Sequence, residues 1–413
     1  IITSDWSSDV CSSDLRARGS GGRGSAPLVR LSALMAVLAI VAVVLGGCSS
    51  ALSAGPVRPG PHVSQPEGRH ELTPEDVTAW LDGKIPDALN RGDLPGAVIT
   101  VVHNGRILVT RGYGHAATGA DGEPQRLVDS DTLFRIASVS KLATSISVMQ
   151  LVERGELDLD TDISTYIDVS IPRRFSGDIT LRNLLTHTAG FEERGKNLVT
   201  SESGPFDLDK SVRQDPPVQV FAPGTTPAYS NYGMSLAGYI VERVSGESFE
   251  DYVREHVLEP AGMDSSTFDQ PLPERLAGRM ANGYKTTGGR AQPFELIDSP
   301  AGGMTTSGTD AGRFMLAMLN QSQGGALLEE GTWKQMFGPG LGADQLGTLA
   351  EGKQMGLGFF DESRNGHQIV GHEGGTVFQA ELEIYPNDGS GVFVAVNELP
   401  RSEERRVGKE CRS

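Results

Sequence analysis

Cysteine is nearly absent from this sequence, whose 413 residues contain three, at positions 11, 48 and 411. Cys11 and Cys411 lie in the terminal stretches 1–25 and 401–413, which resemble translated sequencing-adapter DNA, so we set both stretches apart as non-native. The domain that we expect between residues 72 and 400 then has no cysteine. This excludes a disulfide, a thiol nucleophile and a cysteine metal ligand within it.

Basic residues are also few, with 36 Lys and Arg against 53 Asp and Glu and a formal net charge of −17. Such an acidic chain lacks the electrostatic footprint of a nucleic-acid-binding protein. Two catalytic signatures are missing as well. The sequence has no Gly-x-Ser-x-Gly elbow of the α/β-hydrolases, and His372-Glu373 is not followed by a second histidine at the zinc-helix interval. We therefore expect no nucleic-acid partner, no metal and no cofactor.

The chain also lacks an apolar run of the roughly 20 residues that a membrane-spanning helix needs. Its apolar run at residues 31–47 is shorter, follows Arg23 and Arg30, and ends in Leu45-Gly46-Gly47-Cys48, which resembles a bacterial lipoprotein processing site. We expect residues 26–48 to be a signal peptide with Cys48 as the lipid-attachment site, a plain signal anchor being the alternative. Residues 49–71, rich in Ser, Pro and Gly, predict a flexible linker. The domain is then extracytoplasmic and lipid-anchored to the bacterial cell membrane.

The rest of the chain has strand patterns at both ends and helical patterns between them. β-rich runs at 97–102 and 107–111 flank an Asn-Gly hairpin signal, and further strand patterns lie at 368–370, 376–385 and 391–397. Helical patterns lie at 181–185, 235–244, 249–257 and 311–319, and Thr73 opens an earlier helix. We predict an α+β fold over residues 72–400, in which one antiparallel sheet is built from both chain ends and an all-helical subdomain is inserted.

Ser138 and Lys141 stand three residues apart, where an amphipathic helical pattern begins that runs up to Gly155. This spacing places a hydroxyl and an amine on one helix face, and a lysine with a lowered pKa can take the proton of a serine. The pair alone is weak evidence, because chance supplies about one such spacing in a chain of this composition. Its context, at the start of a buried helix, favours a serine nucleophile with Lys141 as its base.

Two further polar motifs follow in the sequence. Tyr229-Ser230-Asn231 precedes the helical pattern at 235, and there a phenol can relay a proton while the Asn231 amide holds Lys141 and a substrate carbonyl. His372-Glu373-Gly374-Gly375 opens the predicted strand at 376. The glycines permit close backbone approach, so that the N–H groups of Gly375 and Ser138 could form an oxyanion hole. Taken singly, these motifs are more often a packing tyrosine and a turn.

Two other segments compete for a role. Lys285-Thr286-Thr287-Gly288 offers a cation, but it has one residue too many before its glycine and no strand directly after it. His187, in Leu185-Thr186-His187-Thr188, is better explained as a histidine that satisfies backbone groups below the site than as a catalytic group.

In this order, Ser138/Lys141, Tyr229/Asn231 and His372/Gly374 resemble the penicillin-recognising serine hydrolases, in particular the class C β-lactamase-related group that includes D-alanyl-D-alanine carboxypeptidases, D-aminopeptidases and esterases. The stretches 184–190, 260–263 and 301–304 are similar to family segments, so the resemblance covers roughly 72–398. The resemblance implies a β-lactamase/transpeptidase-like fold. It also implies a C-terminal helix that packs against the sheet, and because this sequence stops before such a helix, we expect the domain to be C-terminally truncated.

The resemblance also implies roles for the motif residues. Ser138 is the nucleophile, Lys141 its base or proton shuttle, Tyr229 a general base and acid, Asn231 a holder of lysine and substrate, and His372 an electrostatic partner. His372 stands where β-lactamases usually carry a lysine, and a neutral histidine holds a substrate carboxylate less firmly.

We expect a serine hydrolase that forms an acyl-enzyme on Ser138 and cleaves an amide or ester: a D-alanyl peptide such as a peptidoglycan stem peptide, a β-lactam or a small ester. The alternative is a non-catalytic protein that binds or senses penicillin or peptidoglycan peptide.

Overall fold

The computed structural model describes residues 71–120, 122–194, 199–200, 205–285, 288–293, 296–320, 327–342 and 354–398. The predicted adapter segments, signal peptide, Cys48 and linker lie outside these residues. Across these described ranges, no helix is both long and apolar enough to cross a membrane. The described residues divide into two units, one made of residues 93–398 and the other of residues 71–92, and we describe each by itself.

Helix α2 (Pro74–Gly92) is the described part of the second unit. Its start follows the sequence prediction, because the backbone N–H of Asp76 donates to the Thr73 hydroxyl at 3.2 Å and Pro74 takes the first helical position. Glu75 and Asp76 lie in the first turn, where negative charge is favoured.

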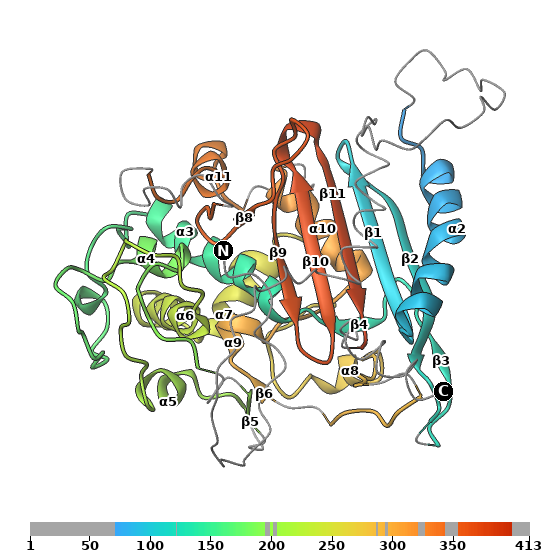
Figure 1. The fold of residues 1–413 in the computed structure, drawn as a ribbon, viewed down its shortest axis with the longest axis horizontal. Helices are drawn as coiled ribbons and strands as arrows, with labels where there is room; N and C mark the ends of the chain where they lie inside the picture. Colours follow the sequence, from blue (N-terminus) through green and yellow to red (C-terminus); the bar gives the residue numbers. More distant parts are fainter. Residues whose placement is uncertain are drawn as a thin grey trace, which may run out of the picture. The chain divides into compact units, whose positions relative to one another are not determined.

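The larger unit is built on a mostly antiparallel sheet (Figure 1). Among the described residues, the order of its strands is β3-β2-β1-β11-β10-β9-β8. The strands are β1 (Gly96–His103), β2 (Arg106–Ala117), β3 (Arg126–Leu127), β8 (Phe360–Asp361), β9 (Val370–Gly375), β10 (Gln379–Tyr385) and β11 (Ser390–Val396). The first strand pairs with the last, from Ala97↔Val396 to His103↔Ser390. This confirms the predicted sheet made from both chain ends.

The predicted hairpin between β1 and β2 is also present. Asn104 and Gly105 have φ values of 48° and 76°, the left-handed conformation that an Asn-Gly turn between two strands requires.

The strand predicted at 376–385 is wrong at its start. His372, Glu373, Gly374 and Gly375 belong to β9, and the chain then turns through Thr376–Phe378 before β10 begins. The Thr376 N–H donates to the Phe378 carbonyl at 2.7 Å, and the Phe378 N–H donates to the Thr376 hydroxyl at 3.1 Å. The β-branched residues of this turn have strand propensity, and the glycines before them do not, so the pattern placed the strand too late.

Helix α10 (Gly308–Met318) packs on one face of the sheet, against β1, β2 and β11. Gly308 and Gly312 allow this approach, since a Cβ on either would lie within 3.0 Å of side chains of β1 or β2. Strand alternation and the register across β11 and β10 place His372 and Gly374 on this same face, and Glu373 on the other. The third motif therefore faces the helices.

Most of the other described helices lie beside the β8–β9 edge of the sheet, while α8 and β4 lie at the end of the sheet below β10, β11 and β1 (Figure 1). The helices beside this edge are α3 (Lys141–Glu153), α4 (Leu181–Leu185), α5 (Leu208–Arg213), α6 (Asn231–Ser245), α7 (Phe249–Val253), α9 (Ser299–Gly302) and α11 (Glu330–Phe337). The bounds of α8 are Glu274–Ala277, and two short strand pairs join β4 (Leu133–Arg135) to β7 (Thr305–Ser307) and β5 (Val199–Thr200) to β6 (Leu296–Ile297). The inserted helical subdomain is thus confirmed.

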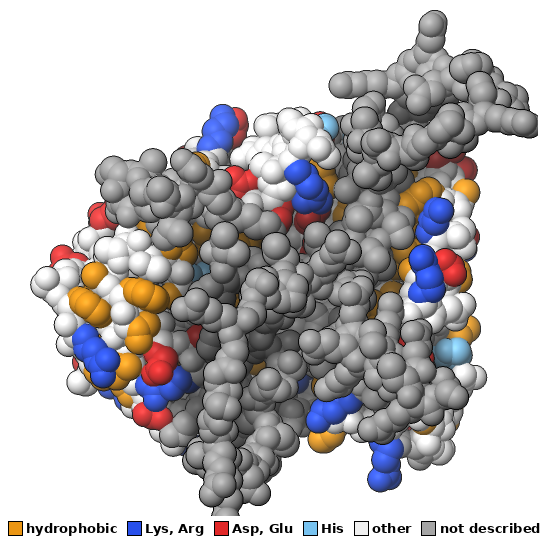
Figure 2. Space-filling view, viewed as in Figure 1, with side chains coloured by type: hydrophobic (Ala, Val, Ile, Leu, Met, Phe, Trp, Pro, Cys, Tyr) orange, Lys and Arg blue, Asp and Glu red, His pale blue; other side chains and the backbone are white. Residues whose placement is uncertain are grey.

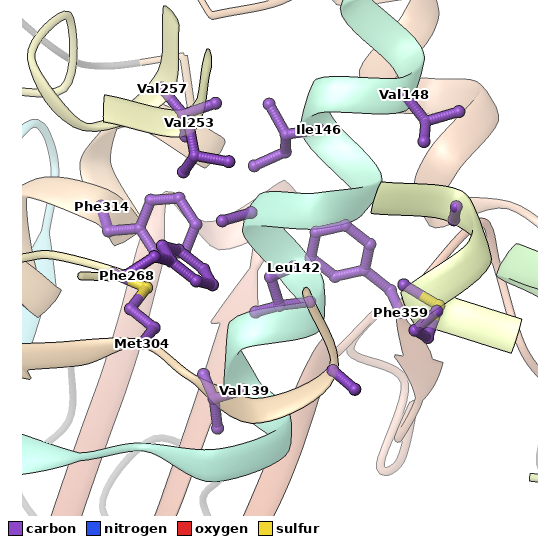
Figure 3. Close-up of a cluster of buried hydrophobic side chains, with 14 of the residues drawn as sticks. Val139, Leu142, Ile146, Val148, Val253, Val257, Phe268, Met304, Phe314 and Phe359 are labelled. Carbon is purple, nitrogen blue, oxygen red and sulfur yellow. The ribbon is translucent and has the colours of Figure 1, made fainter. Parts of the chain in front are cut away.

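Helix α3 differs from the amphipathic helix that the sequence predicts, because it is buried on all sides. Each residue from Lys141 to Met149 is buried. Figure 3 shows apolar side chains surrounding it, among them Val253, Phe314 and Phe359 from other elements. Its small polar residues tolerate burial because their hydroxyls donate to carbonyls: Ser145 to Lys141 at 2.8 Å and Ser147 to Ala143 at 2.9 Å. The sequence pattern does not show that these hydroxyls are satisfied within the helix, so it predicts a polar, exposed face where the structure has a buried one.

Candidate active site

Ser138 lies in a 3-10 turn (Ala137–Ser140) that leads into α3. It is the one residue between Thr132 and Met149 with partial solvent exposure. Ala137, directly before it, has φ 46°, a conformation that is strained for a residue with a side chain. The Ser140 hydroxyl stabilises this turn by donating to the Ala137 carbonyl at 2.5 Å and accepting from the Met304 N–H at 3.0 Å. A buried framework thus presents one hydroxyl to the outside.

Lys141 supplies the amine next to this hydroxyl. Its Nζ lies 2.9 Å from Ser138 Oγ, 2.7 Å from Asn231 Oδ1 and 2.5 Å from the Ala301 carbonyl oxygen. Burial lowers the pKa of Lys141 from 10.5 to about 7, although the negative charges of Glu193 and Asp298 act in the opposite direction. The neutral amine can donate to Asn231 and Ala301 and accept the proton of Ser138 with its lone pair.

Asn231 begins α6, four residues earlier than the predicted start at 235, because Ser230 is the N-cap and accepts from the Gly233 N–H at 3.1 Å. The orientation of the Asn231 side chain depends on Glu193, a residue that no sequence motif identified. The Glu193 carboxylate accepts from the Asn231 backbone N–H at 2.9 Å and from its Nδ2 at 2.8 Å. This directs the amide oxygen of Asn231 toward Lys141.

Tyr229 lies over Lys141, whose Nζ is 5.0 Å from the centre of the phenol ring. Burial raises the pKa of Tyr229 above its ordinary value, and the nearby Ser138 hydroxyl opposes this rise. The phenol is therefore neutral near pH 7, which leaves Lys141 as the stronger candidate for the base.

His187 accepts a backbone N–H, as predicted, and its ring also lies against that of Tyr229. The centres of the two rings are 4.3 Å apart, and His187 Nδ1 accepts the backbone N–H of Ser230 at 3.2 Å. Its own N–H donor, on Nε2, is buried and finds no acceptor among the described residues.

His372 is buried, with 3 % of its surface exposed, and its ring lies 4.8 Å from that of Phe360 and 6.2 Å from that of Tyr229. Its Nδ1 donates to the carbonyl of Glu373 at 2.5 Å, so the proton of the neutral ring is on this nitrogen. Burial, followed by the charge of Lys141, lowers the pKa of His372 to about 3. The ring is neutral near pH 7, and its Nε2 is a buried acceptor for which the described residues provide no donor.

Gly374 brings β9 against the turn that carries Ser138. A Cβ at Gly374 would lie 2.2 Å from the Ile136 carbonyl oxygen and 2.7 Å from the Ser138 nitrogen. Because the N–H of Thr376 bonds to the Phe378 carbonyl across the turn to β10, strand alternation points the N–H of Gly375 away from β10. This direction agrees with the predicted oxyanion hole, which stays a prediction.

Asp298 is a second acid that sequence reasoning missed. It lies directly before α9, is 5 % exposed, and accepts from the Ser211 hydroxyl at 3.0 Å. Burial raises its pKa to about 6, and the charge of Lys141 opposes this rise. Neither Glu193 nor Asp298 has a diagnostic spacing from Ser138, so no motif could identify them. By contrast, Lys285 of the competing segment is exposed, and Thr286 and Thr287 lie outside the described residues.

Five motif residues thus come together around one partly exposed hydroxyl, from the starts of α3 and α6, the segments just before them, and β9: Ser138, Lys141, Tyr229, Asn231 and His372. The arrangement contains a nucleophile, an amine that can take its proton, and a phenol that can relay it. This chemistry suits transfer of an acyl group to serine.

Comparison with known proteins gives a matching family model and several relatives with similar sequences. The family model described as Beta-lactamase matches residues 81–410. The chain is 35% identical over 222 residues to esterase EstB of Burkholderia gladioli, a match that covers 50% of this chain and 55% of the esterase. It is 26% identical over 333 residues to protein flp of Staphylococcus aureus (strain MW2), covering 78% of this chain and 63% of that protein. These matches thus span roughly three fifths of the two relatives' lengths.

The fold is also similar to solved structures. The crystal structure of a beta-lactamase/D-alanine carboxypeptidase from Pseudomonas syringae superposes with a TM-score of 0.64 at 20% identity, covering 81% of this chain and 97% of the other. This likeness establishes a β-lactamase/transpeptidase-like fold.

Proposed function

Because this chain belongs to the beta-lactamase family, we propose that it is a serine hydrolase that forms an acyl-enzyme on Ser138 from an amide or an ester and releases the acyl group to water. The observation that carries the proposal is the position of Lys141. Its buried amine is 2.9 Å from the Ser138 hydroxyl, while its other two contacts are with oxygen acceptors.

Acylation begins when the Ser138 oxygen attacks the substrate carbonyl carbon and its proton passes to the neutral amine of Lys141. The carbonyl electron pair moves to oxygen, and the N–H groups of Ser138 and Gly375 stabilise that oxyanion. When the carbonyl re-forms, the bond to the leaving group breaks, and the leaving group takes a proton from the Tyr229 hydroxyl, which is replenished from Lys141. The products are an ester on Ser138 and a neutral alcohol or amine.

Deacylation reverses the proton path. A water molecule attacks the ester carbonyl, its proton passes through Tyr229 to Lys141, and the same oxyanion forms and collapses. Ser138 then leaves as the alcohol after receiving its proton back from Lys141.

The names of the relatives support both types of substrate. Esterase EstB is named for ester cleavage, and the carboxypeptidase structure is named for cleavage of an amide bond. A D-alanyl peptide, a β-lactam and a small ester are all within the proposed reaction class. A non-catalytic sensor is less well supported, because a protein that only binds needs neither the lowered pKa of Lys141 nor the phenol above it.

The proposal is tested by incubating the purified protein with a fluorophosphonate and, separately, with a fluorescent penicillin, followed by mass analysis of the peptide that contains Ser138. We expect the fluorophosphonate to label Ser138, and Ser138→Ala to abolish labelling. Absence of an adduct with both probes would contradict the proposed enzyme. A penicillin adduct that persists without turnover would favour a carboxypeptidase or the sensor, and rapid turnover would favour a β-lactamase.

A further inference from the structure

We propose that Glu247, Glu255 and His256 bind a zinc ion at a site separate from Ser138. Within the part of the chain that the structure describes, each of these three side chains offers one ligand atom, and the three atoms lie within 4.8 Å of one another. The inference goes beyond the proposed hydrolase function. It also departs from the expectation of no metal, because Glu247 and His256 stand nine residues apart, a spacing unlike that of a zinc-helix motif.

Two connected turns of the backbone bring the three side chains together. Helix α6 is closed by Gly246, whose φ of 78° is left-handed, and the chain then passes through Glu247 into α7, which lies beside α6 (Figure 1). Directly after α7 the helix widens into a π-helical turn, Arg254–Leu258, which carries Glu255 and His256. Such turns are rare and are frequently found at functional sites. The position of the group therefore depends on ordered backbone at both of its sides.

His256 is held in position by contacts that do not involve the other two ligand residues. Its ring centre lies 4.4 Å from that of Tyr252, and its carbonyl oxygen accepts from Gln150 Nε2 at 2.8 Å. Its Nε2 points at the carboxylate of Glu247, 3.2 Å and 3.1 Å from the two oxygens. Zinc binds nitrogen and carboxylate oxygen at about 2.0–2.2 Å, so an ion that replaces the proton between these atoms moves the two side chains little.

The charges around the group favour a dication. The guanidinium of Arg254 is shared by three carboxylates, those of Asp251 at 2.6 Å, Glu255 at 2.8 Å and Glu259 at 3.1 Å. A second guanidinium, that of Arg154, pairs with Glu156 at 2.8 Å. With Glu247, these residues place five carboxylates and two guanidinium groups in one region. The remaining negative charge attracts a cation to it.

The types of ligand atom favour zinc over magnesium and calcium. An imidazole nitrogen together with two carboxylates suits zinc, whereas Mg²⁺ and Ca²⁺ are bound by oxygen ligands. Three protein ligands leave a coordination position for water, since zinc is usually four-coordinate. The site would then hold the turn before α7 to the turn after it.

The group is accessible and lies apart from the reacting serine. The exposed fractions of the side chains are 34% for His256, 37% for Glu247 and 49% for Glu255, so an ion can reach them without unfolding. Gln150, which bonds to the His256 carbonyl, stands on α3 nine residues beyond Lys141, about 13 Å along the helix axis. Changes at the metal site are therefore not expected to alter the serine chemistry.

The test measures zinc binding by the purified protein after dialysis against EDTA. Isothermal titration calorimetry with zinc chloride near pH 7 gives stoichiometry and Kd, and the melting temperature is recorded with and without zinc. We expect one zinc ion to bind per chain. Zinc at roughly 100 times Kd should raise the melting temperature by about 3 °C or more, and Mg²⁺ and Ca²⁺ should not replace it.

Two variants remove one ligand each. Glu247→Gln and His256→Ala should each weaken zinc binding by at least about tenfold, and neither should alter labelling of Ser138 by a fluorophosphonate. Glu247→Gln keeps the shape of the side chain. It therefore remains informative if His256→Ala, which also loses the ring contact with Tyr252, fails to fold.

Two further variants are matched controls. Glu259→Gln removes a negative charge from the same Arg254 guanidinium without removing a ligand. His367→Ala removes a histidine that pairs with the single carboxylate of Asp388, at 2.7 Å. Both should bind zinc as the wild-type protein does.

Several results would overturn the inference. Absence of saturable binding at millimolar zinc would do so, and so would binding that Glu247→Gln leaves unchanged, since the ion then lies elsewhere on the chain. If Glu259→Gln weakens binding as much as Glu247→Gln does, the region attracts cations by charge and does not coordinate one. Equal competition by Mg²⁺ would likewise contradict a site with a nitrogen ligand. None of these results bears on the serine hydrolase, which labelling of Ser138 tests separately.

Discussion

The side-chain amine of Lys141 lies within hydrogen-bonding distance of three oxygen atoms and is 1 % exposed. Burial removes the water that would stabilise its charge, while Glu193 and Asp298 restore part of that stabilisation. The balance leaves an amine that exchanges its proton near neutral pH, which is the range in which a base works best.

This balance predicts the pH dependence of the reaction. Because Lys141 must be neutral to accept the serine proton, kcat/KM for an ester without ionisable groups should rise with pH and level off above about 7, the lowered pKa of the lysine. Glu193→Gln removes a carboxylate that raises this pKa, so the rise should move to lower pH. A rise centred near pH 10, the ordinary range of lysine, would contradict the assignment.

Gly374 gives a prediction based on sterics. In Gly374→Ala the new methyl group would sit 2.2 Å from the Ile136 carbonyl oxygen and 2.7 Å from the Ser138 nitrogen, so β9 or the serine turn must move. We expect kcat/KM to fall by at least about tenfold and stability by about 1–3 kcal/mol, measured by ester hydrolysis and denaturant unfolding. Gly331→Ala, where a Cβ meets no atom within 4 Å, is the control. Wild-type activity in Gly374→Ala would show that this close contact is unnecessary.

At the residue scale, the sequence identifies the groups that react and misses those that tune them. Ser138, Lys141, Tyr229, Asn231 and His372 stand in short motifs whose spacing has chemical meaning. Glu193 and Asp298 act through space, and no local pattern marks a lone acid that folding brings beside a lysine. The charge of His372 also depends on burial, which its motif does not specify.

Among the elements, α3 and the β9–β10 pair decide the geometry of the site. Helix α3 and the sheet strands β1, β10 and β11 follow from apolar patterns and turn signals, and the structure confirms them. Two details could not be predicted, because they depend on partners distant in sequence. They are the burial of α3 on all sides, and the assignment of His372–Gly375 to β9 instead of the start of the next strand.

The β9–β10 pair carries a like-charge contact that predicts a pH effect on stability. Glu381 lies directly opposite Glu373 in the register, and burial, followed by the charges of Glu383 and Glu373, raises the pKa of Glu381. The folded protein therefore holds a proton that the unfolded chain has lost at neutral pH, so this group makes stability fall as pH rises above about 4.5, its unfolded value. Glu381→Gln should raise the melting temperature at pH 8.5 more than at pH 5, and an equal change at both would contradict this explanation.

Across the whole molecule, acidic residues outnumber basic ones, with a formal net charge of −17. On the face drawn in Figure 2, the described basic and acidic side chains are interspersed and do not form separate fields. Charge of this kind supports solubility near a crowded surface. The extracytoplasmic location that the sequence predicts stays a prediction.

The predicted lipid anchor has a direct test in a bacterial host that expresses the chain with residues 26–48 in place. We expect the mature protein in the membrane fraction, with Cys48 as its N-terminus and the mass of a lipid on it. Cys48→Ala should prevent lipidation and leave the precursor unprocessed, with serine labelling retained. A mature N-terminus at another residue would contradict the lipoprotein prediction.

The central claim is that Ser138 and Lys141 act together as the nucleophile and its base. Its most direct test is kcat for hydrolysis of a p-nitrophenyl ester by the wild-type protein, Ser138→Ala and Lys141→Ala, each confirmed as folded by circular dichroism. Groups that act as a unit lose activity together, so we predict that each variant lowers kcat by on the order of 10⁴ or more. A loss of less than about tenfold in either variant would contradict the account.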